Sequence, residues 1–336
     1  MIAELRMRLQ DMWEPIPNAD AFIKKHERFL REWHADVNAI KNREKIKLTM
    51  DRHISEDFRL VRYIRARKHK INKAEHMIRD SLLWRVALGS DLIHEDADLG
   101  MPPEWICRYF GSRDIMTMIH PVEGQERRLQ TLFLRDREGH LGAFLRAGRL
   151  NTRKIFRKLA SNTCYMIKLV VWTAELMRKD LERFREMNPD KPETVISVIV
   201  DLEGFAISDQ VPLGDLLPLA RRFFPIFATS YPELLNRVLV FNAPWLFGSL
   251  WNAVKPFIPE EVQEKIQIHS GAINFEKHIA PYFDPKFVPK YFGGTMVDKT
   301  DGNEFCFDCV VPFGPYGLPE EGAELLEGVD PKAKTW

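Results

Sequence analysis

The first hundred residues carry the pattern of packed helices. Apolar positions recur at helical spacing among many charged ones, glycines are few, and no segment alternates as a strand would. Asn72, followed three residues later by Glu75, is predicted to open one helix as a capping box. One side of that helix is apolar and comprises Ala74, Met77, Ile78, Ser81 and Leu88. We expect residues 1–100 to form a small all-helical bundle.

After residue 110, strands and helices alternate. Residues 195–200 form a β-branched run typical of a strand buried on both faces, and residues 129–134 and 141–145 flank a tight turn. The predicted elements are strands at 129–134 and 141–145, a long helix at 156–187, a strand at 195–200, a helix at about 213–227, and strands at 238–242 and 265–269. This alternation predicts an α/β domain with a largely parallel sheet.

Composition is that of an ordinary folded protein, but the charge is uneven. The 336 residues are 45% hydrophobic and 29% charged, with a formal net charge of +1. Residues 1–90 hold 20 basic and 13 acidic side chains, residues 91–297 hold 26 of each, and residues 298–336 hold 3 and 9. A basic front is compatible with phosphate groups on a lipid surface or on nucleic acid. The acidic tail contains Gly and Pro and has one candidate edge strand at 305–311.

The sequence predicts a cytosolic protein. Four scattered cysteines are typical of a reducing compartment, and no Asn-x-Ser/Thr acceptor occurs. The first residues lack the apolar core of a secretory signal. The longest uncharged run, 238–254, contains Pro244 and Gly248 and is too short for a membrane span.

No motif predicts an enzyme. The chain lacks the zinc-protease, nucleophile-elbow and P-loop patterns. Asp201 and Glu203 follow a predicted strand without a partner base, so we expect them to cap the next turn. Cys306 and Cys309 have no second pair at zinc spacing, and we expect two strand cysteines rather than a metal or redox site.

Residues 59–73 contain seven Lys or Arg and no acid. Such a run forms either a solvated helix face or a phosphate-binding surface. Nucleic acid is the less favoured partner, because aromatic residues do not interleave with the basic ones as base stacking requires.

Residues 244–254 predict a helix without charge. Phe247, Leu250, Trp251 and Val254 fall at helical spacing, and the other side is small and polar. Because surface helices normally carry charge, this helix is either buried all round or faces something apolar such as an acyl chain. The Phe-rich stretches 223–227 and 255–259 are compatible with the walls of an apolar cavity or with plain packing.

A series of short motifs runs along residues 55–297. They are FRLVRYIRARK at 58–68, LWR at 83–85, VIVDLEG at 198–204, YPEL at 231–234, VFNAP at 240–244, KPF at 255–257, KI at 265–266 and YFGG at 291–294. In this order and spacing they resemble the CRAL-TRIO family, the lipid-exchange domain of Sec14-like proteins. The stretch 298–306 also resembles the linker that precedes a GOLD β-sandwich in animal Sec14-like proteins, and we expect that domain to be absent.

The resemblance implies a CRAL-TRIO fold, in which a mixed, largely parallel sheet floors an apolar pocket closed by a gate helix, preceded by an all-α bundle. The implied domains are a helical region at 1–100, with the family's N-terminal domain at about 50–90, a lipid-binding domain at 110–297 and an acidic tail at 298–336. Segment 244–254 corresponds to the gate. The implied pocket and gate residues are Val198, Val200, Phe223, Phe241, Trp245, Phe247, Leu250, Trp251 and Val254.

Members that bind phosphatidylinositol hold its phosphate with basic residues. The matching positions here are Arg67, Lys68 and Lys265, and Glu233 resembles a residue tied to that site. A threonine usual near the phosphate is Val262 here. Members that bind choline lipids use hydroxyl side chains where this chain has Ile196, Val198 and Ala143, so we do not expect a choline lipid.

The leading hypothesis is a cytosolic, monomeric, non-enzymatic protein that binds one lipid, with phosphatidylinositol favoured, and transfers or presents it during transient contact with membranes. It needs no cofactor other than this ligand. A second hypothesis is a carrier of a retinoid, tocopherol or squalene-like molecule. A third is a lipid-responsive adaptor that captures a protein partner through the acidic tail.

Overall fold

The computed structural model describes residues 1–10, 19–33, 35–92, 116–117, 136–145, 147–149, 151–158, 163–186, 195–288 and 292–295. The predicted strand at 129–134, the cysteine pair and the acidic tail lie outside these residues. The chain forms two compact units. The first comprises 1–101, 162–175 and 218–233, and the second comprises 102–161, 176–217 and 234–336. The predicted domain boundaries stay a prediction.

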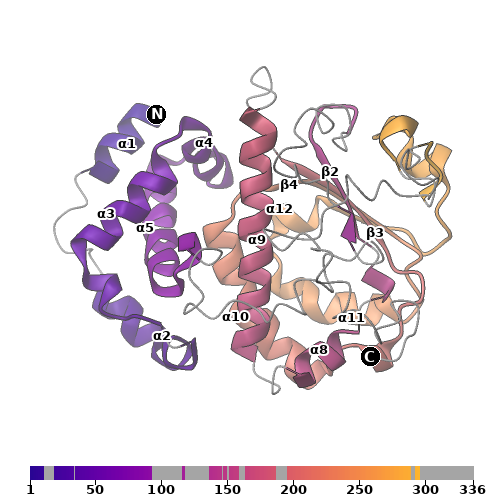
Figure 1. Ribbon diagram of the computed structural model, residues 1–336, viewed down its shortest axis with the longest axis horizontal. Helices are drawn as coiled ribbons and strands as arrows, with labels where there is room; N and C mark the ends of the chain where they lie inside the picture. Colours follow the sequence, from indigo (N-terminus) through magenta and orange to yellow (C-terminus); the bar gives the residue numbers. More distant parts are fainter. Residues whose placement is uncertain are drawn as a thin grey trace, which may run out of the picture. The chain divides into compact units, whose positions relative to one another are not determined.

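The first unit contains the N-terminal helices α1 to α5 (Figure 1). Their bounds are Ile2–Gln10, Ala19–Trp33, Arg43–Ile54, Asp57–Ala66 and Ile71–Leu88. Four of these helices share one apolar core made of Leu5, Leu9, Met50, Leu60, Tyr63, Ile64, Ala74, Met77, Ile78 and Leu82. The predicted apolar side of α5 is buried along its whole length, which confirms the helical bundle.

The capping box predicted for α5 is wrong. The helix begins at Ile71, so Asn72 already lies within its first turn. The Asn72 side chain accepts a hydrogen bond of 2.6 Å from Nη1 of Arg8, and Glu75 forms an ion pair with the same arginine. The side chains of Asn72 and Glu75 therefore bind Arg8 on α1 instead of capping the start of α5.

The second unit is built on a five-stranded sheet with the order β1-β2-β3-β4-β5 (Figure 1). The strands are Met116–Thr117, Leu141–Leu145, Ile196–Asp201, Leu235–Phe241 and Ile266–Ile268. β2, β3, β4 and β5 run parallel to one another, whereas the short β1 pairs antiparallel with β2. The mixed, largely parallel sheet and the N-terminal helices confirm the predicted fold class.

Helices connect the parallel strands, as parallel pairing requires. They are α8 (Thr152–Lys158), α9 (Thr163–Glu186), α10 (Leu213–Ser230), α11 (Phe247–Val254) and α12 (Glu260–Gln263). α9 lies within the range 156–187 that was predicted as one helix, whereas α8 begins at Thr152 and overlaps that range only at 156–158. α10 continues three residues beyond its predicted end. β4 begins at Leu235 rather than at 238, because its first residues pair with β3 across a register shift.

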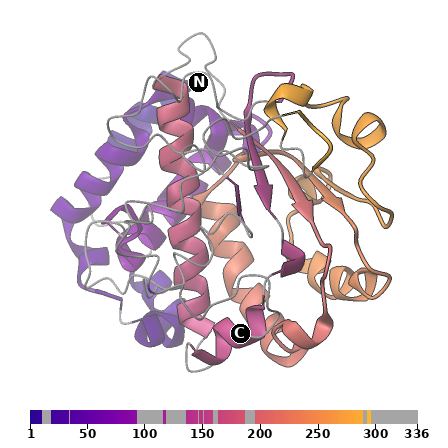
Figure 2. The same cartoon turned by 45° about the vertical axis from the view of Figure 1, so that its right-hand side comes forward.

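The two faces of the central sheet carry different side chains. On one face Ile199, Leu239 and Phe241 form a core with Ile279, Phe283, Val288 and Phe292. In Figure 2 this C-terminal segment, coloured orange to yellow, lies beside the strands. The opposite face carries the alternate valines of β3 and β4, and the candidate site begins there.

Candidate functional site

The candidate site is a continuous aliphatic face of the sheet. Residues paired in register on neighbouring strands point to the same side, so the register defines the rows of side chains on each face. One row is Ala143, Val198, Val238 and Ile266, and a second is Leu145, Val200, Val240 and Ile268. Both rows are aliphatic from β2 to β5. We call this set the aliphatic rows; they offer hydrocarbon and no hydrogen-bonding side chain.

Part of this face is buried and part is accessible. Val198 and Val240 are 9% and 6% exposed, whereas Val200 and Ile266 are half-buried and Ile268 is 37% exposed. Val240 also belongs to a small core with Leu202 and Ala243. Apolar surface therefore extends from a packed centre toward β5.

α11 packs against this face through its first residue. Phe247 contacts the small core around Val240, and its ring meets Phe205 edge-on with centroids 5.7 Å apart. The predicted uncharged helix is confirmed, although it begins at Phe247 rather than at Pro244.

The two sides of α11 differ in exposure but not in charge. Leu250, Trp251 and Val254 are half-buried, whereas Gly248 and Asn252 are exposed. None of its side chains is fully buried. A short helix with so little buried surface has a low local stability, which is typical of elements that move.

Trp245 lies just before α11 and is 84% exposed, more than any other large hydrophobic residue that the structure describes. An exposed indole is characteristic of surfaces that contact the membrane interface or another protein. Trp245 stands two residues before the first residue of the uncharged helix.

Polar contacts fix the chain between β4 and α11. Asn242 has a φ of 53°, and its Nδ2 donates a hydrogen bond of 2.7 Å to Oδ1 of Asp201. The same oxygen accepts a bond of 2.8 Å from the N–H of Glu203, which confirms that Asp201 caps the turn after β3. Asp201 is 1% exposed. A side chain on β3 thus holds the residue at which the chain leaves β4.

The other end of α11 returns to β5 through a short, well-bonded segment. Gln263 on α12 donates from Nε2 to the carbonyl oxygens of Lys255 and Ile258, at 3.1 and 2.7 Å. The carbonyl oxygen of Lys265 then accepts from the N–H of Val238 at 2.8 Å, which joins this segment to β4. Lys265 is half-buried and stands directly before β5.

The predicted head-group residues belong to both units. Arg67 and Lys68 lie in the turn that ends α4, where Lys68 has a φ of 50°, and Glu233 has a φ of 53°. These three residues are in the first unit, whereas Lys265 is in the second. Their gathering around one phosphate stays a prediction. Left-handed backbone at non-glycine residues is uncommon and is often found at functional sites. This conformation is compatible with a functional role for Lys68 and Glu233.

Two predicted pocket residues lie elsewhere. Phe241 is fully buried in the core on the opposite face of the sheet, because it is offset by one residue from Val240. Phe241 is therefore not part of the candidate site on the aliphatic rows. Phe223 lies on the part of α10 within the first unit, where its ring contacts Phe227 with centroids 5.2 Å apart. Its role in a pocket stays a prediction.

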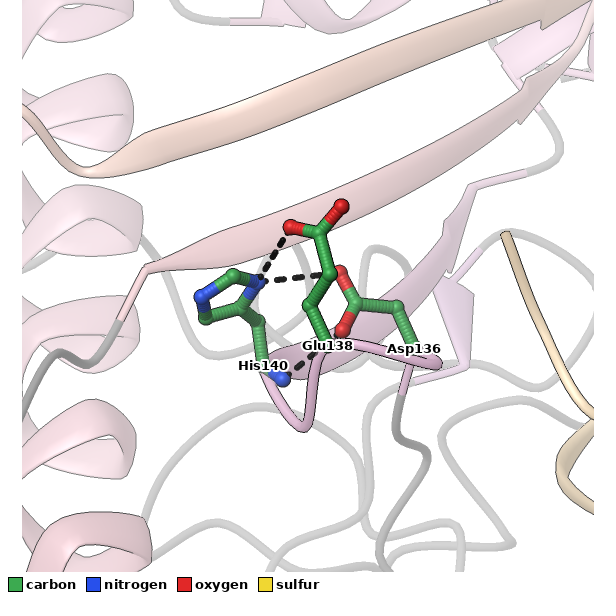
Figure 3. Close-up of side chains that lie close together, drawn as sticks. All are labelled: Asp136, Glu138 and His140. Carbon is green, nitrogen blue, oxygen red and sulfur yellow. Dashed lines mark hydrogen bonds and ion pairs between the residues drawn. The ribbon is translucent and has the colours of Figure 1, made fainter. Parts of the chain in front are cut away.

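A polar cluster that the sequence did not predict lies at the turn before β2. Figure 3 shows Asp136, Glu138 and His140 pointing toward one another from this turn. Asp136 Oδ2 lies 3.1 Å from Nδ1 of His140 and accepts a bond of 2.6 Å from Ser197 on β3. Asn236, at the bulge in β4, donates to the same oxygen at 3.2 Å. The cluster ties the turn to two strands that are distant in sequence.

The cluster is a hydrogen-bonded lock rather than a cation site. Its three ligand-type groups lie within 4.8 Å of one another, but Glu138 also pairs with Arg237 at 2.5 Å, so a cation would face a guanidinium. Burial alone would raise the pKa of Asp136, yet hydrogen bonds from His140 and Ser197 hold it below its usual range. The bond to Asp136 raises the pKa of His140. Only the Asp-x-x-Gly turn pattern was visible in the sequence.

The first unit contains a second buried polar network, which the sequence also did not predict. Arg85 is 1% exposed, and its Nη1 lies 2.9 Å from Oε1 of the buried Glu175 on α9. The hydroxyl of Tyr231 donates to the same carboxylate oxygen at 2.6 Å, and Asp91 also pairs with Arg85. Burial would lower the pKa of Arg85, but Asp91 and Glu175 raise it well above its ordinary value. This network joins the LWR and YPEL motifs.

In the part of the chain that the structure describes, no helix is long and apolar enough to span a membrane.

A family model described as the CRAL/TRIO domain matches residues 125–294. One relative is CRAL-TRIO domain-containing protein T23G5.2 from Caenorhabditis elegans, with 25% identity over 326 residues. The match covers 94% of this chain and 41% of the relative, so this chain spans about two fifths of its length. A solved structure, the crystal structure of Sfh5, aligns with a TM-score of 0.46 and 16% identity, over 81% of this chain and 80% of that chain.

Proposed function

Because this chain belongs to the CRAL/TRIO domain family, we propose that it holds one lipid molecule between the aliphatic rows and α11 and transfers or presents it between membranes. Membership of this family implies the binding and transfer of a lipid or small hydrophobic ligand. The observation that carries the proposal is that both rows are aliphatic across four parallel strands. A packed core alone does not require an uncharged, incompletely buried helix at its edge.

Hydrocarbon burial supplies the binding energy in this proposal. Each CH₂ group removed from water contributes about 0.8 kcal/mol, so an acyl chain placed along both rows competes with the bilayer it came from. No side chain in the rows hydrogen-bonds, so the polar head group of the lipid lies away from Val198 and Val200. The rows contact the acyl chains of the lipid and offer its head group no hydrogen bond.

We further propose that phosphatidylinositol is the favoured ligand. Arg67, Lys68 and Lys265 would each donate charge-assisted hydrogen bonds to the inositol phosphate, the strong kind of hydrogen bond. Glu233, held in left-handed backbone, would order the same region. The absence of hydroxyl groups from the aliphatic rows supports phosphatidylinositol over a choline lipid.

Contact with the membrane is assigned to Trp245 and the basic turn after α4. The exposed indole of Trp245 would enter the membrane interface, and the exposed Lys68, Lys70 and Lys73 would be attracted by anionic lipid. Members of the family generally act as ligand-binding transfer proteins, and we propose no catalytic step for this chain.

A carrier of a small neutral hydrophobe is the second candidate. The aliphatic rows favour it as strongly as they favour an acyl chain, because a polyene or isoprenoid presents the same surface as a hydrocarbon. The two candidates differ in whether Arg67, Lys68 and Lys265 matter for binding.

The test is native mass spectrometry of the full chain after incubation with liposomes that contain phosphatidylinositol, phosphatidylcholine, tocopherol and squalene. We expect one phosphatidylinositol per protein, with occupancy reduced about tenfold or more in Lys68→Ala/Lys265→Ala. The matched control is Lys24→Ala/Lys286→Ala, which removes one exposed cation from each unit at positions with no predicted role in head-group or membrane binding. Capture of tocopherol or squalene that neither double variant alters would establish the second candidate instead.

A further inference from the structure

Three stacked rings lie next to the connection into α11. His269 directly follows β5, and its ring stacks on that of the buried Phe241 with centroids 5.1 Å apart and planes 12° apart. His278, on the one-turn π-helix Phe275–Ile279, stacks on His269 with centroids 4.7 Å apart and planes 30° apart. Both histidines are half-buried. We call His269 and His278 the histidine pair.

The backbone around His269 holds the start of the connection into α11. The N–H of His269 donates to Val240 at 2.8 Å, and its carbonyl oxygen accepts from the N–H of Ala243 at 3.3 Å. The carbonyl oxygen of Gly271 accepts from Asn242 at 3.3 Å. A displacement of His269 would therefore break hydrogen bonds to the segment that connects β4 to α11. This segment includes Asn242 in its left-handed conformation.

The histidine pair is built to be neutral in this arrangement. Burial lowers the pKa of His269, and His278 and Lys277 lower it further. Nδ1 of His278 accepts a hydrogen bond of 3.3 Å from the N–H of Asn274, which requires that this nitrogen carries no proton. The uncharged side chain of Phe241 faces the histidine pair from β4. The π-helix carries the cation Lys277 and the exposed Glu276.

We propose that the histidine pair is a proton-sensitive latch, and that its protonation at an anionic membrane surface releases the connection into α11. Two imidazolium rings cannot remain stacked without strong repulsion, so proton binding favours an arrangement in which the rings separate and Ala243 loses its bond to His269. The inference rests on the proposed function in so far as α11 is the element that opens over the lipid.

The membrane itself supplies the signal. An anionic leaflet carries a surface potential of about −30 mV, which concentrates protons about threefold at the surface relative to the bulk. The ratio of protonated to neutral His269 is therefore about threefold higher at the membrane surface than in bulk solution, so the latch opens more often where the lipid must be exchanged. This regulation needs no second ligand.

The first test is amide hydrogen exchange of residues 242–254 in the full chain at pH 7.5 and pH 5.5, corrected for the intrinsic exchange rate. We expect opening to increase about five- to tenfold at the lower pH, in the range of ordinary coupling between sites. His269→Phe/His278→Phe keeps the rings but cannot bind protons, and it should abolish the increase. His76→Gln, which removes an exposed histidine on α5, should retain it. An equal increase in the double Phe variant would overturn the latch.

A second test uses the unaltered protein and so does not depend on the folding of a variant. The ring protons of His269 and His278 are followed by NMR from pH 5 to 8. Titration of His269 below the usual histidine range, with a chemical-shift change of the His278 ring in the same step, supports the latch, as does a titration of His269 at higher pH in Lys277→Gln. Independent titration of the two rings at ordinary values contradicts it.

Transfer of pyrene-labelled phosphatidylinositol separates this inference from the proposed function. Faster transfer to phosphatidylserine-containing vesicles than to pure phosphatidylcholine vesicles at one bulk pH, with a smaller difference in the double Phe variant than in the unaltered protein, supports both. Transfer without dependence on the histidine pair leaves the proposed function intact and overturns the latch. A proton-dependent opening without any lipid carried leaves the latch intact and contradicts the proposed function.

Discussion

Asn242 donates a hydrogen bond of 2.7 Å from Nδ2 to the buried Oδ1 of Asp201, across the ends of two neighbouring parallel strands. Asn242 stands in left-handed backbone directly after β4, and Asp201 is the last residue of β3. The pair therefore sets the direction in which the chain leaves the sheet toward α11. Asparagine is among the residues that tolerate this backbone conformation best, and its amide supplies the donor that a buried carboxylate needs.

Replacement of Asn242 by alanine should destabilise the protein by about 2 kcal/mol. The change removes a bond to a buried carboxylate and places a residue with less tolerance for positive φ at this position. Denaturant unfolding would measure the loss. Asn242→Gly relieves the backbone but not the bond, so it should recover only part of the stability. A loss in the glycine variant as large as that in the alanine variant would assign the whole effect to the hydrogen bond, and no loss in either would contradict the role of the pair.

Arg85→Met should cost about 3–5 kcal/mol of folding free energy. It leaves the buried Glu175 carboxylate without its cation, and such uncompensated charges are strongly destabilising. Urea unfolding measures this loss. Arg28→Met, which breaks an exposed pair with Glu32 one turn along α2, is the control and should cost less than about 1 kcal/mol. Equal losses in the two variants would show that the buried network contributes no more than a surface pair.

Substitution of His140 by glutamine should destabilise the protein at pH 5.5 but hardly at pH 8.5. The pKa of His140 is raised in the folded protein, so its stabilisation is complete below the ordinary histidine pKa and is lost as pH rises through the raised value. The pKa of Asp136 is lowered, so its contribution is present above the ordinary carboxylate pKa and is lost as pH falls. Between the ordinary pKa of a carboxylate and that of histidine, His140 is protonated and Asp136 is ionised. In this pH range the variant should lose about 1 kcal/mol of folding free energy. A loss independent of pH would contradict the ion pair.

A charge on the half-buried side of α11 should weaken lipid binding. Trp251→Glu places a carboxylate on the side of α11 that we expect to contact the lipid. Because burying an unpaired charge against hydrocarbon is costly, the dissociation constant of the lipid should rise about tenfold or more. Asn252→Glu adds the same charge on the exposed side and should change it less than about twofold. Fluorescence titration with labelled phosphatidylinositol measures both. The reverse order of effects would place the lipid on the other side of α11.

Periodic patterns predicted the elements that bury a simple apolar face. The run at 195–200 became β3, and the apolar side of α5 is buried as predicted, because each element's own residues determine these features. The uncharged segment containing Phe247 and Trp251 also proved to be a helix. The resemblance of short motifs then identified the family, which periodicity alone does not do.

Features that depend on distant partners were not predictable. Asn72 has the sequence of a cap but bonds to Arg8, which lies on a different helix. Phe241 was predicted to line the pocket, but it packs in the core on the face opposite Val240, because a shift of one residue reverses the facing of a side chain in a strand. The lock at Asp136 needs Ser197 and Asn236, and only the parallel sheet brings these strands beside the turn. Local sequence carries no record of such pairings.

The most direct test of lipid binding on the aliphatic rows is photocrosslinking. Phosphatidylinositol with a diazirine near the end of an acyl chain is loaded from vesicles, activated, and mapped on the protein by peptide mass spectrometry. We expect crosslinks to β3 and β4 at Val198, Val200 and Val240 and to α11 at Leu250 and Trp251. Crosslinks confined to the exposed Trp245, or to the opposite face at Ile199 and Phe283, would contradict it.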